Sequence, residues 1–189
     1  MKQGRFLLVP FVAIGFCLGE SLNASQIEGI EFKEICNIGQ QRLVLSSVAL
    51  MRYKIVIKAF VAALYLGDGT KPRDALTDVP KRLEIHYFWD LKGKEIVKAA
   101  NKILAENLTP SELEKQRGEI DEMNALFENV KAGDRYTLTY IPGVGTELAL
   151  NGKKKGIVGG ASFASAYFKI WLGKNPMDIA LRDALLKNH

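Results

Sequence analysis

Cysteine and histidine are scarce in this chain, and their scarcity excludes several kinds of functional site. The 189 residues include only two cysteines, Cys17 and Cys36, and two histidines, His86 and His189. Cys17 lies in an apolar N-terminal segment, so the rest of the chain cannot form an internal disulfide. The histidines are far apart and lack zinc-type spacing. We therefore expect no metal site and no cofactor, and we assign no catalytic residue.

A strong excess of charge is also missing. The chain has 26 basic and 21 acidic residues, a net charge of +5. Its one dense basic cluster, Lys153 to Lys155, directly follows Asn151 and Gly152, and an exposed turn accounts for three such charges. No basic face interleaved with aromatic residues is evident, as a nucleic-acid-binding surface would require. Nucleic acid is therefore not an expected partner.

The N-terminal apolar run is too short to cross a bilayer comfortably. Lys2 and Arg5 precede the apolar sequence FLLVPFVAIGFCLG. A charged start followed by a short apolar core is typical of an export signal. We predict a signal peptide over residues 1–24 and a mature domain over residues 25–189, located in the periplasm or secreted and without a stable membrane span.

Two alternatives to cleavage after Ala24 remain open. The segment could stay uncleaved as a membrane anchor, although Glu20 and Asn23 end it without a stop-transfer cluster. Lipid attachment at Cys17 is disfavoured, because Phe16 stands where a bacterial lipoprotein signal has a small residue.

Hydrophobic patterns in the remaining chain predict one domain whose order is strands, two helices, strands and further helices. Alternating apolar residues indicate strands, whereas apolar residues at three- and four-residue spacing indicate amphipathic helices. The predicted strands are residues 27–32, 41–45, 53–66, 81–89, 135–143, 146–152 and 153–158; the predicted helices are residues 93–107, 110–130, 159–173 and 175–186.

Local capping and turn residues support these boundaries. Thr109 is placed as an N-cap with Glu112 three residues later, the pattern of a capping box. Asn151 followed by Gly152 predicts a tight hairpin. In the last helix, Asn175 is the expected N-cap, and Asp178 would favour the helix N-terminus.

One residue stands out inside the apolar run over residues 43–66. Only Arg52, Lys54 and Lys58 carry charge there. Long basic side chains usually extend from a strand into water, which is the simplest interpretation of Arg52. The alternative is that Arg52 belongs to a ligand-binding site, because a guanidinium stays charged and offers two parallel donors to an anion.

Three segments together resemble a known family. The sequences LMRYKIVIKAFVAALYL, YIPGVGTELALNGKKKGIVGG and FASAYFKIWLG, in this order, resemble bacterial chalcone isomerase-like proteins. The resemblance implies an α+β fold in which a large antiparallel β-sheet packs against a layer of α-helices. It also implies a ligand cleft between the sheet and the helices, with Arg52 at the position of an arginine that meets an anionic group.

The same resemblance bears on catalysis. Phe60 and Ile170 stand where the family's isomerases carry hydroxyl residues, which suits binding better than cyclisation. We therefore predict a non-catalytic protein that binds a fatty acid or a similar amphipathic anionic small molecule. The predicted ligand-binding residues are Arg52, Phe60, Phe163, Tyr167 and Trp171.

Other functions remain open at this point. One is an isomerase, an intramolecular lyase acting on a chalcone-like or other enone substrate, and another is an accessory domain that binds a protein. A serine hydrolase is a weaker alternative, in which GGASFA would present Ser162 as the nucleophile. The histidine of such a triad could only be His189, at the end of the chain.

Overall fold

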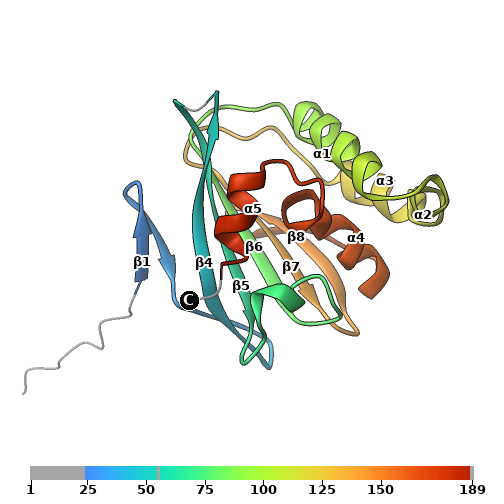
Figure 1. The fold of residues 1–189 in the computed structure, drawn as a ribbon, viewed down its shortest axis with the longest axis horizontal. Helices are drawn as coiled ribbons and strands as arrows, with labels where there is room; N and C mark the ends of the chain where they lie inside the picture. The colour runs from blue at the N-terminus through green and yellow to red at the C-terminus, as the bar shows by residue number, and fades with distance from the viewer. Residues whose placement is uncertain (1–23, 55, 188–189) are drawn as a thin grey trace, which may run out of the picture.

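The centre of the computed structural model, which describes residues 24–54 and 56–187, is a seven-stranded antiparallel sheet (Figure 1). Neighbouring strands follow the order of the chain from β3 to β9. Its strands are β3 (Ile35–Ile38), β4 (Gln41–Tyr53), β5 (Ile57–Gly67), β6 (Lys81–Tyr87), β7 (Arg135–Ile141), β8 (Gly145–Leu150) and β9 (Lys153–Val158). Long connections follow β5 and β6, where one short helical turn and three helices are inserted.

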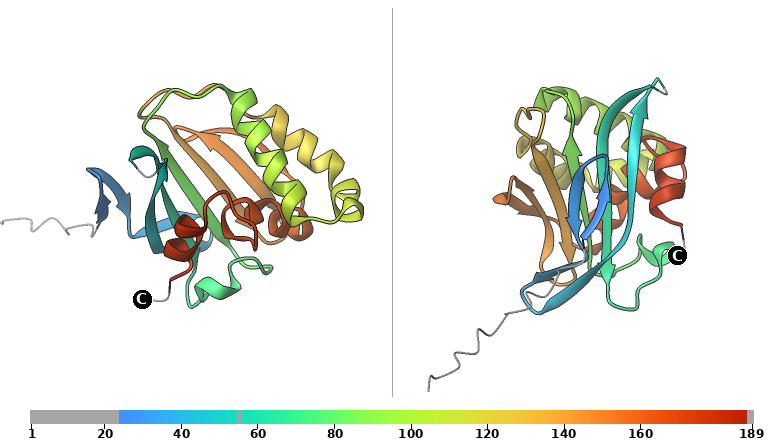
Figure 2. Two further views of the ribbon diagram at one scale, coloured as in Figure 1. Left: turned by 45° about the horizontal axis from the view of Figure 1, so that its top comes forward. Right: turned by 90° about the vertical axis from the view of Figure 1, so that its left-hand side faces the viewer.

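Five helices cover one face of this sheet (Figures 1 and 2). They are α1 (Gly93–Asn107), α2 (Pro110–Lys115), α3 (Arg117–Ala125), α4 (Ala161–Leu172) and α5 (Ile179–Leu185), and a 3-10 turn, η1 (Pro72–Asp74), follows β5. The arrangement confirms the predicted α+β fold of a large antiparallel sheet against a helical layer. No helix within residues 24–54 and 56–187 combines the length and apolar character needed to span a membrane.

The opposite face of the sheet is covered in part by the hairpin of β1 (Ala24–Ile27) and β2 (Ile30–Lys33). Phe32 of β2 is fully buried against Val61, Ala63 and Tyr65 of β5. The intervening β5 residues belong to the main core on the helical side. Because apolar neighbours cover both faces, β5 is apolar at successive positions rather than at alternate ones.

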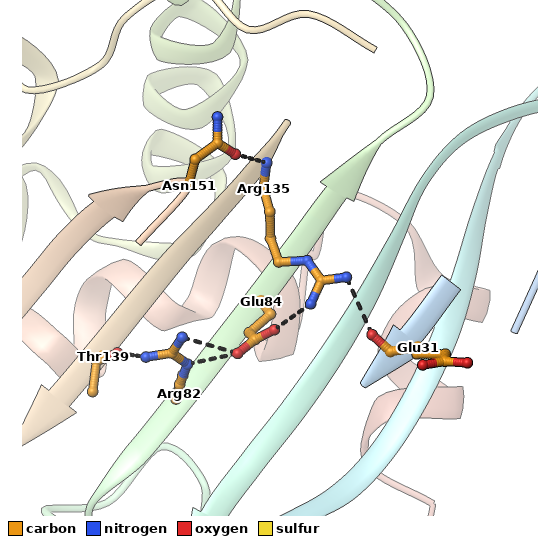
Figure 3. A network of polar contacts seen from close by, with 6 residues as sticks. All are labelled: Glu31, Arg82, Glu84, Arg135, Thr139 and Asn151. Atoms are coloured by element: carbon orange, nitrogen blue, oxygen red, sulfur yellow. Dashed lines mark hydrogen bonds and ion pairs between the residues drawn. The ribbon is translucent and has the colours of Figure 1, made fainter. Parts of the chain in front are cut away.

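A polar network joins this hairpin to the sheet (Figure 3). Glu84, which is almost fully buried, accepts from Arg82 at 2.9 Å and from Arg135 at 3.1 Å. Arg135 also donates to the backbone oxygen of Glu31 at 3.2 Å, and its guanidinium lies 4.6 Å from the ring centre of Phe32. Two cations thus compensate one buried carboxylate, and one of them reaches across to β2.

Several predicted helix and turn features are confirmed. Helix α1 spans the predicted residues 93–107, and Thr109 forms a capping box with Glu112. The turn between β8 and β9 has both Asn151 and Gly152 at positive φ, as a tight hairpin of this type requires.

Three predicted elements need correction. Residues 27–32 are not one strand but parts of β1 and β2, with a turn at Glu28 and Gly29, both at positive φ. The run 53–66 is interrupted after Tyr53 by a turn in which Lys54 has a φ of 47°. The helix predicted over 110–130 divides into α2 and α3 around Gln116 and ends at Ala125.

The start of the last helix also differs from the prediction. Helix α5 begins at Ile179 with Asp178 as its N-cap, and the Asp178 carboxylate accepts from the backbone nitrogen of Leu181 at 2.7 Å. Asn175 is not the cap, since its side chain instead donates to the backbone oxygen of Glu106 at 2.6 Å. The predicted signal peptide up to residue 23 and the hydrolase candidate His189 lie outside the described residues.

Candidate ligand-binding cavity

A cavity of about 670 Å³ lies between the sheet and the helices. Its wall is built from the ends of three strands and from helices α1 and α4, with further residues from the connecting segments. Almost every side chain in the wall is apolar or aromatic. The lining residues are Met51, Tyr53, Ile57, Ala59, Phe60, Ile85, Tyr87, Trp89, Leu91, Glu95, Ile96, Ala99, Ala100, Ile103, Phe127, Tyr167, Ile170, Trp171 and Met177.

Residue spacing explains why these side chains converge. Ile85 and Tyr87 are two residues apart in β6, so they lie on the same face of the sheet. In α4, Ile170 and Trp171 follow Tyr167 by three and four residues, and this spacing places all three side chains on one side of the helix. Sheet and helix thereby present two apolar surfaces to the space between them.

Two polar atoms in this wall have no partner within the described part of the chain. The hydroxyl of Tyr167 and the indole nitrogen of Trp171 are both buried without a hydrogen bond. Burial raises the pKa of the Tyr167 phenol above its ordinary value, and the nearby Tyr87 adds to the effect. Both groups therefore stay protonated at neutral pH, as donors that are enclosed in the wall and have no acceptor among the described residues.

The wall offers no cation to such an acceptor. Among the described residues that line the cavity there is no lysine, arginine or histidine, and Glu95 is the only carboxylate. Glu95 accepts from the backbone nitrogen of Lys92 at 3.4 Å, which is its role in the capping of α1. Apart from Glu95, the polar groups of the wall are thus the neutral hydroxyl and indole groups of its tyrosines and tryptophans.

Exposed apolar side chains surround one end of the cavity. We call this group the apolar rim and define it as Tyr53, Val56, Ile57, Trp89 and Leu91; all five are exposed, and all but Val56 line the cavity. The indole nitrogen of Trp89 donates to the backbone oxygen of Lys58 at 2.7 Å, which fixes the loop after β6 beside the β4–β5 hairpin. The two segments lie at the same end of the molecule in Figure 1.

Three of the five predicted site residues line the cavity, namely Phe60, Tyr167 and Trp171. Phe163 lies behind the wall, where it is buried with its ring centre 5.2 Å from that of Tyr167. It supports the position of Tyr167 rather than contacting the open space.

Arg52 is placed differently from the other four predicted residues. Its neighbours Met51 and Tyr53 line the cavity, and because side chains alternate along a strand, Arg52 lies on the opposite face of β4. There its guanidinium pairs with Glu28 in the β1–β2 turn. No arginine within the described part of the chain lines the cavity. That Arg52 binds a ligand stays a prediction.

The most informative residues missed from the sequence are on β6 and α1. Tyr87 alternates with Ile85 in β6, and Ile96, Ala100 and Ile103 form an apolar stripe on α1; such patterns by themselves indicate core residues. The available signal was Trp89 near the end of its strand, since tryptophan is enriched at interfaces.

The hydrolase alternative finds no support in the geometry. The Ser162 hydroxyl accepts from the side-chain nitrogen of Gln116 at 2.6 Å. Over the described residues, no three acidic, histidine or cysteine side chains are grouped as a metal site would need. The cavity is the candidate functional site.

Comparison with known proteins agrees with this architecture. A family model described as chalcone isomerase-like matches residues 24–187. The solved structure of a fatty-acid binding protein of Arabidopsis thaliana superposes with a TM-score of 0.66 and 15% sequence identity, over 87% of this chain and 96% of that one. No curated protein matches the sequence significantly. At this identity the solved structure establishes a shared fold.

Proposed function

Because the chain belongs to the chalcone isomerase-like family, we propose that its cavity binds an elongated, largely apolar small molecule of the fatty-acid type. The observation that carries this proposal is the cavity itself, about 670 Å³ of space with a wall of aliphatic and aromatic side chains. That volume lies within the range of small-molecule sites. The shared fold with a fatty-acid binding protein supports the same class of ligand.

The two unpartnered donors select the polar end of the ligand. A buried donor left without an acceptor costs about 1–3 kcal/mol, so a ligand whose entry shifts the wall enough to bring an acceptor to Tyr167 and Trp171 gains from both. An ionised carboxylate would meet no compensating cation among the described lining residues. The ligand group favoured beside Tyr167 and Trp171 is therefore a carbonyl, as in a protonated carboxylic acid or an ester.

Binding fits the cavity better than the isomerase alternative. Phe60 and Ile170, which stand at hydroxyl positions of the family's enzymes, both line the cavity and provide no acid or base there. A protein-binding accessory domain would leave the apolar cavity without a role. Export to the periplasm or secretion stays part of the proposal, and sequencing of the mature N-terminus would test it, with Ser25 as the expected first residue.

A titration with matched ligands tests the proposed function. We would measure binding of a long-chain fatty acid, its methyl ester and the alkane of equal length at pH 8, in detergent-free buffer. The ester should bind at least as tightly as the ionised acid, and both more tightly than the alkane. If neither acid nor ester binds, the proposed function is wrong.

The same series also decides where the polar end lies. An acid that binds more than tenfold tighter than its ester would point to a cation such as Arg52 as the partner of the head group. That result would retain a binding function and overturn the assignment of the head group to Tyr167 and Trp171.

A further inference from the structure

The apolar rim is the largest concentration of exposed apolar side chains on the described surface. Five of the eight exposed large hydrophobic residues belong to it, including Val56 at 75% exposure, Trp89 at 58% and Tyr53 at 54%. They come from two segments that a hydrogen bond holds together, the β4–β5 hairpin and the loop before α1. An exposed apolar patch of this kind marks a surface that is covered during function.

Basic side chains flank the rim. Lys54 follows Tyr53, with its amine 5.4 Å from the centre of that ring, and exposed Lys92 follows Leu91. Two carboxylates lie nearby and keep their negative charge, but both are bonded to backbone nitrogens, Asp90 to that of Ala132 at 2.8 Å and Glu95 to that of Lys92 in the cap of α1. The rim therefore combines apolar groups with two lysine amines that form no ion pair among the described residues, and these amines suit an anionic lipid surface.

The aromatic residues fit the same occupant. Tyrosine and tryptophan are enriched where proteins meet the interface between lipid and water. The indole nitrogen of Trp89 already donates to the backbone of Lys58, so the indole can leave water without losing a hydrogen bond. A lipid surface that supplies the ligand requires the rim to be continuous with the apolar cavity. A protein partner has no such requirement.

We propose that the apolar rim docks onto a membrane containing anionic lipid and turns the open end of the cavity toward it. A ligand could then pass between bilayer and cavity without crossing water. That transfer rests on the proposed function, but the docking does not, and vesicles without added ligand can measure it.

The chain's two tryptophans allow a direct test. Trp171→Phe leaves Trp89 as the only fluorescent indole, and vesicles of phosphatidylcholine with phosphatidylglycerol brominated on the acyl chains quench an indole that enters them. We expect quenching of Trp89 and co-sedimentation of the unmodified protein with the vesicles. Both should weaken when phosphatidylglycerol is omitted or salt is raised.

Val56→Asp is the decisive variant, because Val56 is in the rim but not in the cavity wall. It should reduce vesicle binding at least tenfold. Val144→Asp is the matched control, since Val144 is 62% exposed and lies in the β7–β8 turn, outside the rim. It should bind vesicles as the unmodified protein does.

The outcomes separate docking from ligand binding. Vesicle binding that is absent, or that Val56→Asp and Val144→Asp reduce equally, overturns the docking proposal. A dimer that Val56→Asp converts to a monomer, without vesicle binding, overturns it in favour of an interface between two copies. Normal docking without fatty-acid binding supports the docking proposal and contradicts the proposed function alone.

Discussion

Arg52 and Glu28 form an ion pair of 3.3 Å between the end of β4 and the turn of the β1–β2 hairpin. Lys58, opposite Arg52 in β5, binds the other oxygen of the same carboxylate at 2.5 Å. Glu28 itself sits at positive φ in its turn. The arginine that is prominent in the sequence therefore holds the hairpin against the sheet, on the face opposite the cavity.

The position of Arg52 predicts a small effect on ligand binding. Arg52→Ala should change the affinity for a fatty acid less than threefold and should alter binding of the alcohol of equal length to the same extent. Because the ion pair is partly exposed, the free energy of unfolding should fall by about 1 kcal/mol or less. Calorimetric titration with a thermal melt measures both. A tenfold loss confined to the acid would confirm instead that Arg52 binds the head group.

Tyr167→Phe should act in opposite directions on stability and on binding. Without ligand, the change removes a buried hydroxyl that has no partner, so the free energy of unfolding should stay equal or rise. The affinity for an ester or a protonated acid should fall by about threefold to tenfold, equivalent to about one hydrogen bond.

Tyr136→Phe is the control for that experiment. The Tyr136 hydroxyl accepts from the backbone nitrogen of Glu128 at 2.8 Å and does not line the cavity. Its loss should lower the free energy of unfolding by about 1 kcal/mol and leave ligand affinity unchanged. Equal effects of both variants on affinity would contradict a direct role for Tyr167.

Much of the fold was predictable because its signals are local. The stripe of Ile96, Ala100 and Ile103 located α1, and Thr109 with Glu112 located the start of α2. The turn after Tyr53 was not predictable in the same way, since its apolar sequence contains neither glycine nor proline and places Lys54 at positive φ.

The candidate site was predictable only in part. Tyr167 and Trp171 were found because α4 is apolar on every side, but the same pattern describes a packed core and a cavity wall. Arg52 alternates regularly with Met51 and Tyr53 along β4, and the extra residue of the register shift beside it, Ala59, is in β5. Alternation separates the two faces of a strand, but it does not tell which face borders the cavity and which is covered by the β1–β2 hairpin.

Because Lys81 is buried, we expect the free energy of unfolding to rise with pH. Burial lowers its pKa to about 8, against 10.5 ordinarily, although the nearby Asp78 opposes this. The amine is enclosed by the rings of Tyr140 and Phe168 and donates to the backbone oxygen of Thr77 at 2.7 Å. Between about pH 8 and pH 10 the unfolded chain binds more protons, so the free energy of unfolding should rise by about 2 kcal/mol.

Chemical unfolding across this pH range measures the effect of Lys81. Lys81→Met should abolish the rise, whereas Lys102→Met, at an exposed site on α1, should retain it. The rise of stability ends near pH 10. Burial raises the pKa of the Tyr65 and Tyr87 phenols above the ordinary value, so the unfolded chain loses these phenolic protons first. Above that pH the free energy of unfolding therefore falls. A flat profile of the unmodified protein between pH 8 and pH 10 would contradict the prediction.

Glu84→Gln should loosen the β1–β2 hairpin. The change leaves Arg82 and Arg135 without their shared buried carboxylate, and loss of one member of such a network should lower the free energy of unfolding by about 2 kcal/mol. Arg135 also binds Glu31 and covers Phe32, so hydrogen exchange should accelerate most in β1 and β2. Glu114→Gln, which breaks an exposed ion pair with Arg117, should change stability by less than about 0.5 kcal/mol. If both variants cost the same, or if exchange in the hairpin is unchanged, the network does not anchor the hairpin to the sheet.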